Sequence, residues 1–267
     1  VFLFGLIIGS FLSAFTYRNP RKFYINKGRS FCDKCKKQII WYDNIPLLSY
    51  LLLQGRCRNC RKNISLRYPL IEFTTSLIFL SIYYFYENCS FLALDNLYSK
   101  LSFCGIREIL GIWSLPIGFL IAFLLIAIFI IDFENQIIPD NLVFFLSVIA
   151  LILLILTSNN GFFTTVFSAF VSSLFFLFLF LITKGKGMGA GDIKLVLALS
   201  LFLNWHYILL YIFLSFSLGA IIGIILIIFH KARFGKHIPF APYIILSFLM
   251  TYLFGDKLMM VLFPLLN

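Results

Sequence analysis

Charged side chains are scarce in this sequence. Asp, Glu, Lys and Arg make up 12% of its 267 residues, whereas soluble domains usually contain about 25%. Apolar residues reach 61%, against about 45–50% in soluble domains. The composition therefore excludes an ordinary water-soluble domain and predicts a polytopic membrane protein.

The usual nucleotide-binding glycine motifs are missing as well. The segment KGKGMGAGD (184–192) contains alternating glycines, but it lacks the GxxxxGK[ST] pattern of a phosphate-binding loop. A dinucleotide-binding turn would follow a β-strand, whereas a 22-residue apolar run precedes this segment. No glycine-rich nucleotide site stands out in residues 1–72, and no internal repeat is evident.

The basic N-terminal region of a cleavable signal peptide is also absent. The sequence starts at Val1 inside an apolar stretch, so residues 1–17 are expected to stay as a first membrane span. A span needs about 20 apolar residues. The apolar runs predict an all-α membrane bundle with about eight spans, at residues 1–17, 68–86, 113–131, 141–157, 162–183, 193–204, 207–229 and 240–255.

Basic residues are concentrated between the first two predicted spans. Residues 18–68 hold 13 of the 22 Lys and Arg residues and only two acids, Asp33 and Asp43. A basic patch can bind nucleic acid, but the positive-inside rule explains this one without nucleic acid, because it places the segment in the cytoplasm beside anionic lipid. The same rule puts residues 184–194 on the cytoplasmic side and the loop 87–112 outside.

Four of the six cysteines lie in this basic segment, as CDKC (Cys32, Cys35) and CRNC (Cys57, Cys60). Two CxxC turns about 20 residues apart are typical of a tetrahedral zinc site, because each turn presents two thiolates. A redox CxxC pair and two disulfides are the alternatives, and a cytoplasmic location disfavours disulfides. We predict a structural zinc ion that has four cysteine ligands and no open position for catalysis.

The other cysteines and the histidines give no clear function. Cys89 and Cys104 lie in the predicted outer loop, where a disulfide and two free thiols are equal alternatives. His206, His230 and His237 have no partner residue in the sequence and are interpreted as interfacial side chains.

Acidic residues are few outside the basic segment, and four of the nine lie at or near span ends: Asp132, Asp140, Asp192 and Glu72. Ionisable groups beside spans are costly and indicate function. Asp132 ends the third predicted span and Asp192 begins the sixth, at the same cytoplasmic edge, so their carboxyl groups can meet. Two close carboxyl groups share one proton, so one serves as acid while the other activates water. The pair predicts peptide hydrolysis without a metal.

The residues around these aspartates refine the prediction. Gly189 and Gly191 come just before Asp192, where their small size leaves room for a substrate backbone. Asp140 follows a proline and precedes an apolar run, which favours a helix N-cap.

Two functions other than proteolysis stay open at this point. One is a transporter or channel whose intramembrane acids relay protons or cations. The other is a non-catalytic assembly factor. The transporter hypothesis does not explain why the acids gather at one edge, beside glycines, without an acidic path through the spans.

The assembled motifs resemble the type IV prepilin peptidase family, the bifunctional leader peptidase/N-methyltransferases of pilus and type II secretion systems. The resemblance covers nearly the whole chain. Its segments are GLIIGSFLSAFTYRNP (5–20), the cysteine region (31–72), IDFENQIIPDNL (131–142), KGMGAGDIKLVLALSLFLNW (186–205) and IPFAPYIILS (238–247). Two small departures are Ala190 and Ala241, which stand where the family has glycine.

The resemblance implies an intramembrane aspartic protease whose catalytic pair is Asp132 and Asp192, and it places Asp140 where the family also has asparagine. It implies prepilin or pseudopilin substrates with a short basic leader, cut after a glycine at the cytoplasmic face of the bacterial inner membrane. The cysteine region implies the bifunctional form, which methylates the new amino terminus with S-adenosylmethionine. The residues that bind this donor are unknown. Membrane lipid and a second copy in a homodimer are the other expected partners.

The expected division is a first span (1–17), a cytoplasmic zinc module with four cysteines (18–67), a second span with an outer loop (68–112), and a membrane-embedded peptidase domain (113–267).

Overall fold

A computed structural model describes residues 1–20, 30–32, 34–88, 103–157, 161–185, 187–229 and 239–262. The alternatives for Cys89 and Cys104, and the interpretation of His230 and His237, lie outside the described side chains. The helices in chain order are α1 (Phe2–Arg18), η1 (Trp41–Asn44), α2 (Leu48–Leu52), α3 (Arg67–Glu87), α5 (Phe103–Leu110), η3 (Gly111–Trp113), α6 (Ser114–Asn135), α7 (Asp140–Thr157), α8 (Phe162–Ile182), α9 (Ala190–Ser200), η4 (Trp205–Tyr207), α10 (Ile208–Ile228) and α11 (Ala241–Leu262).

Five helical segments are long and apolar enough to cross a membrane: Gly105–Asn135, Asp140–Thr157, Phe162–Ile182, Trp205–Ile228 and Ala241–Leu262. Helix α1 is apolar but has only 17 residues, α9 has 11, and α3 is not among the five. Within the described residues the all-helical class is therefore confirmed, with five membrane-capable helices. The count of eight spans stays a prediction.

The chain divides into two compact units. The first comprises Val1–Asn88 with Leu115–Ala127, and the second comprises Cys89–Ser114 with Ile128–Asn267. Helix α6 contributes residues to both units, so the boundary falls inside a helix instead of at a loop.

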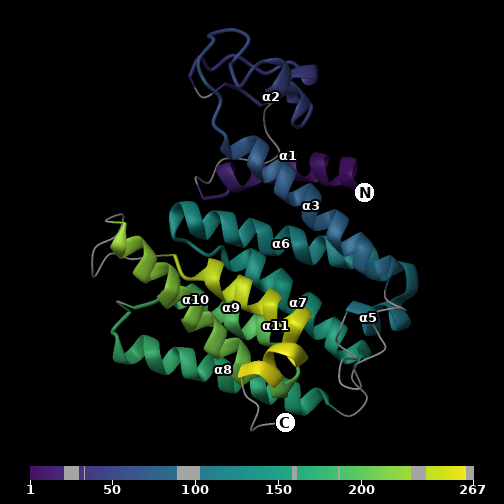
Figure 1. The fold of residues 1–267 in the computed structure, drawn as a ribbon, viewed down its shortest axis with the longest axis vertical. Coiled ribbons are helices and arrows are strands. Elements are labelled where there is room, and N and C mark those ends of the chain that lie inside the picture. Colours follow the sequence, from purple (N-terminus) through teal and green to yellow (C-terminus); the bar gives the residue numbers. More distant parts are fainter. Residues whose placement is uncertain are drawn as a thin grey trace. The chain divides into compact units, whose positions relative to one another are not determined.

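In the first unit, α1 and α3 pack closely against each other (Figure 1). A Cβ added to Gly5 would lie 2.6 Å from the Ser76 Cα, and one added to Gly9 would lie 2.7 Å from the Glu72 Cα. Two glycines four residues apart thus let the two backbones approach, as small residues do between membrane helices. The Arg67 guanidinium donates hydrogen bonds across the same pair of helices, to the Ser13 carbonyl and the Thr16 hydroxyl.

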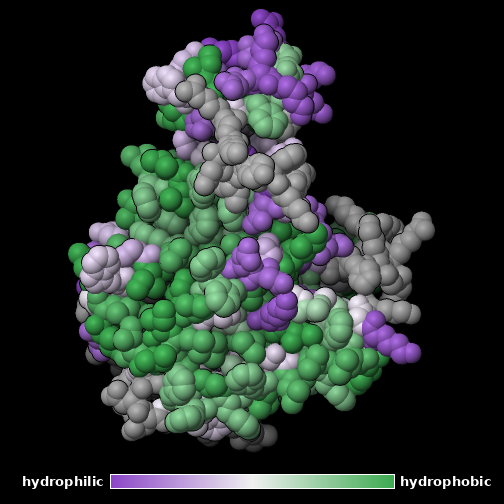
Figure 2. All heavy atoms as spheres, turned by 180° about the vertical axis from the view of Figure 1, so that it is seen from behind, coloured by the Kyte–Doolittle hydropathy of each residue, from purple (hydrophilic) through white to green (hydrophobic). Residues whose placement is uncertain are grey.

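In the second unit, α9 lies among α7, α8 and α11 (Figure 1). Buried serine pairs join neighbouring helices: Ser172 on α8 bonds Ser200 on α9 at 2.8 Å, and Ser215 on α10 bonds Ser247 on α11 at 2.6 Å. In a lipid environment the hydrophobic effect does not drive helices together, so interhelical hydrogen bonds of this kind help to hold them in contact. Figure 2 shows hydrophobic side chains over most of the visible surface of the helices.

Two elements differ from the sequence expectation. Helix α11 continues to Leu262, beyond the predicted end at residue 255, with a kink at Phe254, where φ is −128° and ψ is 17°. Just after the kink, the Tyr207 hydroxyl donates a hydrogen bond to the Asp256 carboxylate. The short helix α5 was not expected, because it lies in the polar outer loop.

Candidate active site and metal site

Asp132 lies in the last turn of α6. The chain leaves this helix through Gln136, whose φ of 55° is left-handed and whose N–H donates to the Asp132 carbonyl at 2.8 Å. The Asp132 side chain is buried, with 5% of its surface exposed. Its Oδ2 accepts a hydrogen bond from the Ala241 N–H, 3.1 Å away, in the first turn of α11. A carboxylate at a helix N-terminus is favoured by the unpaired N–H groups there.

Asp192 is the third residue of α9 and is also buried, with 4% of its surface exposed. Its Oδ2 accepts the Gly189 N–H at 2.8 Å, and its own N–H donates to the Gly189 carbonyl at 3.2 Å. This reciprocal arrangement satisfies N–H groups that the first turn of a helix leaves unpaired. Contacts within three residues of the chain therefore orient this carboxyl group.

The two aspartates belong to the same unit, and the charge of Asp132 acts on Asp192. Each carboxyl group has one oxygen bound by a single backbone N–H. The second oxygen of each has no hydrogen-bond partner among the described residues. Two buried carboxyl groups of one unit, each with one oxygen that has no partner among the described residues, are suited to bind a water molecule.

The two glycines before Asp192 have different surroundings. A Cβ at Gly191 would lie 2.9 Å from the Ile138 Cβ, so the connection between α6 and α7 fills that space. A Cβ at Gly189 would approach nothing closer than the Asp192 Oδ2, at 3.5 Å. The space beside Gly189 thus remains free, whereas Gly191 permits close packing of Ile138. A substrate backbone passing these glycines stays a prediction.

Asp140 was expected to cap α7, but the helix begins at Asp140 itself. The Pro139 carbonyl accepts the N–H groups of Leu142 and Val143, so the proline stands at the cap position. The Asp140 carboxylate instead pairs with the Lys194 ammonium at 2.7 Å, and both side chains are more than half exposed. The sequence did not reveal this pairing, because the two residues are 54 positions apart.

Tyr211 was missed by the sequence analysis, since a tyrosine in an apolar run is usually a packing residue. Its side chain on α10 is fully buried, and its hydroxyl has no hydrogen-bond partner in the described part of the chain. The charge of Asp192 acts on this hydroxyl. A buried hydroxyl without a partner is costly, so a water molecule or a substrate group is expected to complete its hydrogen bonding.

The four predicted cysteines meet in the segment between α1 and α3, which we call the Cys module. The sulfur atoms of Cys32, Cys35, Cys57 and Cys60 all lie within 4.8 Å of one another, and the cysteines are free. The Cys32 and Cys60 sulfurs are 3.9 Å apart. Zinc–sulfur bonds of about 2.3 Å give tetrahedron edges of about 3.8 Å. The cluster therefore fits a tetrahedral metal ion, and neither CxxC pair is a disulfide.

The two CxxC turns are built alike. Cys32 N–H donates to the Lys37 carbonyl and Cys57 N–H to the Lys62 carbonyl. A left-handed residue follows each turn, Lys36 in the first and Arg61 in the second. The sequences CDKCKKQI and CRNCRKNI (32–39 and 57–64) match this geometry, so the module contains a short internal repeat that the sequence analysis overlooked.

The thiols of the second turn have opposite pKa shifts. The backbone N–H of Cys60 lowers the pKa of Cys57 to about 7. The Lys62 N–H also acts to lower the pKa of Cys60, but burial and the neighbouring thiols outweigh it and raise that pKa to about 11. A bound cation would offset the negative charges of thiolates that lie this close together.

Glu72 joins the Cys module to α3. Its buried carboxylate accepts the Leu47 N–H at 2.9 Å. Leu47 has a φ of 57°, a left-handed value that is rare for a leucine. The hydrogen bond holds this strained turn in place, and it gives the fourth acid singled out in the sequence a structural partner.

Comparisons with known proteins agree with this architecture. The model of the bacterial peptidase A24 N-terminal domain matches residues 3–86, and that of the type IV leader peptidase family matches residues 119–224. A prepilin leader peptidase/N-methyltransferase of Aeromonas salmonicida is 31% identical over 97% of this chain and 91% of its own length. That of Pseudomonas aeruginosa is 30% identical over 96% and 90%.

A third relative of the same name, from Vibrio cholerae, is 37% identical over 55% of this chain, and the match spans 53% of that protein's length. No solved structure matches the chain. The alignments with the Aeromonas and Pseudomonas proteins extend over nearly the whole chain, and the prediction of an enzyme is confirmed at the level of the family. The chain belongs to the prepilin leader peptidase/N-methyltransferase family.

Proposed function

We propose that the chain cleaves the leader peptides of prepilins or pseudopilins after a glycine, with Asp132 and Asp192 as its catalytic pair. The observation that carries this proposal is the burial of both aspartates in one unit, each oriented by a backbone N–H and each with a free oxygen. The names of the relatives support the substrate class.

Two carboxyl groups that share one proton can hydrolyse a peptide bond. The ionised aspartate takes a proton from water while the water oxygen bonds to the peptide carbon, and the protonated aspartate gives its proton to the carbonyl oxygen. In the second step each aspartate returns to its starting state. The aspartate that gave its proton to the carbonyl oxygen now takes a proton from one hydroxyl of the tetrahedral intermediate. The aspartate that took a proton from water gives it to the peptide nitrogen, and the carbon–nitrogen bond breaks. The pair then carries one proton again.

The cytoplasmic side of the inner membrane is the proposed location of cleavage. Lys194 lies two residues after Asp192 on α9, and it is exposed beside Asp140. The preceding segment 184–194 is basic, which supports a cytoplasmic position under the positive-inside rule. The substrate's apolar helix would then enter among the membrane helices while its leader stays outside the bilayer.

Methylation of the new amino terminus is the second proposed activity, with S-adenosylmethionine as donor. The relatives' printed name supports it. No binding residues are assigned to the donor. The cavity of the Cys module is a poor match, because three arginines line it and the donor's sulfonium group is itself a cation.

Zinc is the proposed metal of the Cys module. Four thiolates in a tetrahedron are the donor set that zinc takes in structural sites. The residues that would hold it are Cys32, Cys35, Cys57 and Cys60. With all four positions filled, the ion would fix the two turns of the module and take no part in cleavage.

Replacement of either aspartate by asparagine tests the peptidase proposal. In membranes containing Asp132→Asn or Asp192→Asn, cleavage of a model prepilin should fall by at least about 10²–10⁴-fold, because each variant lacks an acid–base group. The assay is gel separation of precursor and mature pilin over time.

Asp140→Asn is the matched control, since it makes the same change in an exposed ion pair of the same unit. It should keep most of the activity. Full cleavage by Asp132→Asn or Asp192→Asn would contradict the assignment, and so would complete loss in Asp140→Asn alone. The same assay separates a peptidase from a transporter or an assembly factor.

A further inference from the structure

Apolar side chains stand exposed on the Cys module. Trp41 is exposed by 79%, Leu51 by 70% and Leu52 by 82%. Leu48, also exposed, lies three and four positions before these leucines, so the three leucines share one face of α2. Trp41 is on η1, which packs against α2. We call these four side chains the apolar patch.

The apolar patch lies on elements that are held together by several contacts. On the other side of α2, Tyr50 packs against Gly55, where an added Cβ would lie 2.8 Å from the tyrosine hydroxyl. Arg58 binds both carboxylate oxygens of Asp43, at 2.7 and 2.8 Å, and lies over the Tyr42 ring. These contacts tie η1 to the second CxxC turn, so exposure of the patch does not come from a frayed loop.

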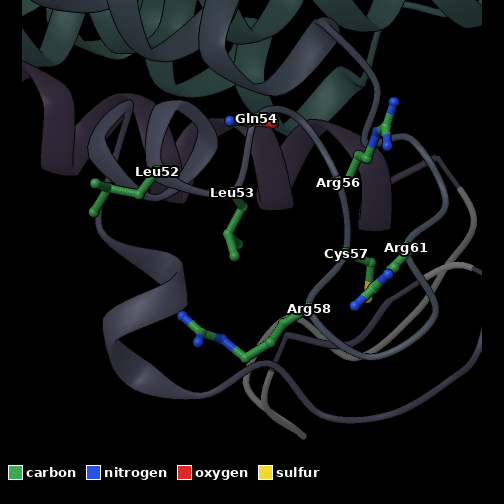
Figure 3. Close-up of a pocket in the computed structure, with 7 residues that line it drawn as sticks. All are labelled: Leu52, Leu53, Gln54, Arg56, Cys57, Arg58 and Arg61. Carbon is green, nitrogen blue, oxygen red and sulfur yellow. The ribbon is translucent and has the colours of Figure 1, made fainter.

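A cavity of about 350 Å³ opens beside the patch, lined by Leu52, Leu53, Gln54, Arg56, Cys57, Arg58 and Arg61. Leu53 points into the cavity, and Arg58 and Arg61 extend toward it from other sides (Figure 3). Asp43 neutralises Arg58, whereas Arg56 and Arg61 have no ion-pair partner among the described residues. Arg61 therefore extends a guanidinium group without a described ion-pair partner toward the cavity that Leu53 enters, whereas the Arg56 guanidinium points away from Leu53 at the rim (Figure 3).

The charge of the module decides between occupants. Residues 30–66 of the module contain seven Lys and Arg residues and two acids. A second copy would bring the same positive charge to the same surface, which is repulsive. An anionic surface is attracted instead, and guanidinium groups bind phosphate in a two-pronged fashion. Segments that lie in a membrane interface also combine leucine and tryptophan with lysine and arginine.

We propose that the apolar patch and the arginine-lined cavity bind anionic phospholipid of the membrane that holds the chain's apolar helices. Trp41 and the leucines of α2 enter the boundary between headgroups and acyl chains, and Arg56 and Arg61 bind the phosphates. The hydrogen bond from the Leu47 N–H to Glu72 ties the start of α2 to α3, so the patch stays close to this helix. The proposal does not depend on the peptidase activity.

Tryptophan fluorescence of the full chain in lipid nanodiscs tests this surface. Replacing Trp113 and Trp205 by phenylalanine leaves Trp41 as the single tryptophan. Lipids with bromine near the top of the acyl chains quench tryptophans at that depth. Brominated phosphatidylglycerol should quench Trp41 at least about twofold more strongly than brominated phosphatidylcholine, because the anionic lipid attracts the module.

Two double variants separate lipid binding from general charge. Arg56→Gln with Arg61→Gln should remove the preference for phosphatidylglycerol. Lys34→Gln with Lys37→Gln removes the same charge from exposed lysines outside the cavity and should leave most of the preference intact. Equal losses in both double variants would overturn the phosphate sites.

Other outcomes would overturn the proposal as a whole. One is a Trp41 that aqueous iodide quenches and brominated lipid does not. Another is protection of Trp41 from iodide that appears only with two copies of the chain per disc, or only after a prepilin is added. In either case a protein, and not a lipid, would cover the apolar patch. A photoactivatable phosphatidylglycerol provides a second measurement on the unaltered chain. Its adducts should map to residues 41–61, and their absence there would count against lipid binding.

Discussion

Single side chains at the candidate active site are held mostly by the main chain. Asp132 and Asp192 each receive one backbone N–H, from Ala241 and Gly189. Tyr211 differs, because its buried hydroxyl has no hydrogen-bond partner among the described residues. The same hydroxyl interacts electrostatically with Asp192. We therefore expect the Tyr211 hydroxyl to bind a water molecule or a substrate group in the proposed reaction.

Tyr211→Phe removes this hydroxyl and keeps the ring. We expect the rate of prepilin cleavage to fall roughly tenfold or more, which is the cost of losing a hydrogen bond to a charged site. The melting temperature should stay the same or rise, since an unsatisfied buried hydroxyl disappears. Initial rates and a thermal melt of the purified variant measure the two effects.

Thr251→Val is the matched control. It removes another buried hydroxyl without a described partner, ten residues along α11 from Ala241, or about 15 Å of helix. It should leave the cleavage rate unchanged. If Tyr211→Phe also cleaved at the wild-type rate, its hydroxyl would have no part in the reaction.

At the scale of helices, the start of α9 and the connection from α6 to α7 set the position of both aspartates. Gly191 lets Ile138 pack against the first turn of α9, where a larger residue would meet it at 2.9 Å. Ile138 follows Asp132 by six residues and Gly191 directly precedes Asp192. This one contact therefore couples the end of one helix to the beginning of the other.

Gly191→Ala should consequently reduce cleavage by about tenfold or more, because reacting groups lose rate steeply when displaced by fractions of an ångström. Gly189→Ala should keep most of the activity, since its new methyl group meets only ordinary contacts and its backbone is extended. Prepilin cleavage measured for both variants checks the contrast.

The double variant Gly191→Ala with Ile138→Gly removes the Cβ that the alanine would strike. It should recover part of the rate lost in Gly191→Ala, whereas Ile138→Gly alone should cost less than Gly191→Ala, because it removes a packing contact without introducing a clash. No recovery, or equal losses at both glycines, would favour the predicted substrate path over helix packing as the reason for Gly191.

At the scale of the whole molecule, the metal cluster and the aspartates belong to different compact units. The thiols must lose their protons to bind a metal, so protons compete with it. The pKa of Cys57 is about 7 and that of Cys60 about 11 in the metal-free cluster. The metal-bound form binds fewer protons, and it is therefore favoured as the pH rises.

Purified protein should contain about one zinc ion per chain, and this content should drop as the solution is made acidic, because protons compete with the metal for the thiolates. Atomic emission spectroscopy after dialysis at a series of pH values gives the profile. Cys57→Ser should lose the metal, while Cys104→Ser, which changes none of the four predicted ligands, should retain it. A stable, ordered Cys module without metal at neutral pH would refute the zinc proposal.

Much of this architecture was predictable, and the reasons can be read from particular residues. Long apolar runs predicted α8 and α10 to within one residue at each end, and the CxxC spacing predicted the cysteine cluster. The roles of Ile138, Ala241 and Tyr211 were not predictable. Each depends on a contact between segments far apart in the sequence, made by a residue type that normally serves packing.

The hydrogen bonds from Ala241 and Gly189 have a consequence for mutational tolerance. Every amino acid except proline carries a backbone N–H, so the side chains at these two positions can drift without removing the donors. Alanine scanning would not detect these two hydrogen bonds, because alanine keeps the backbone N–H. Replacing the backbone amide by an ester, or the residue by proline, would remove the donor and reveal its contribution.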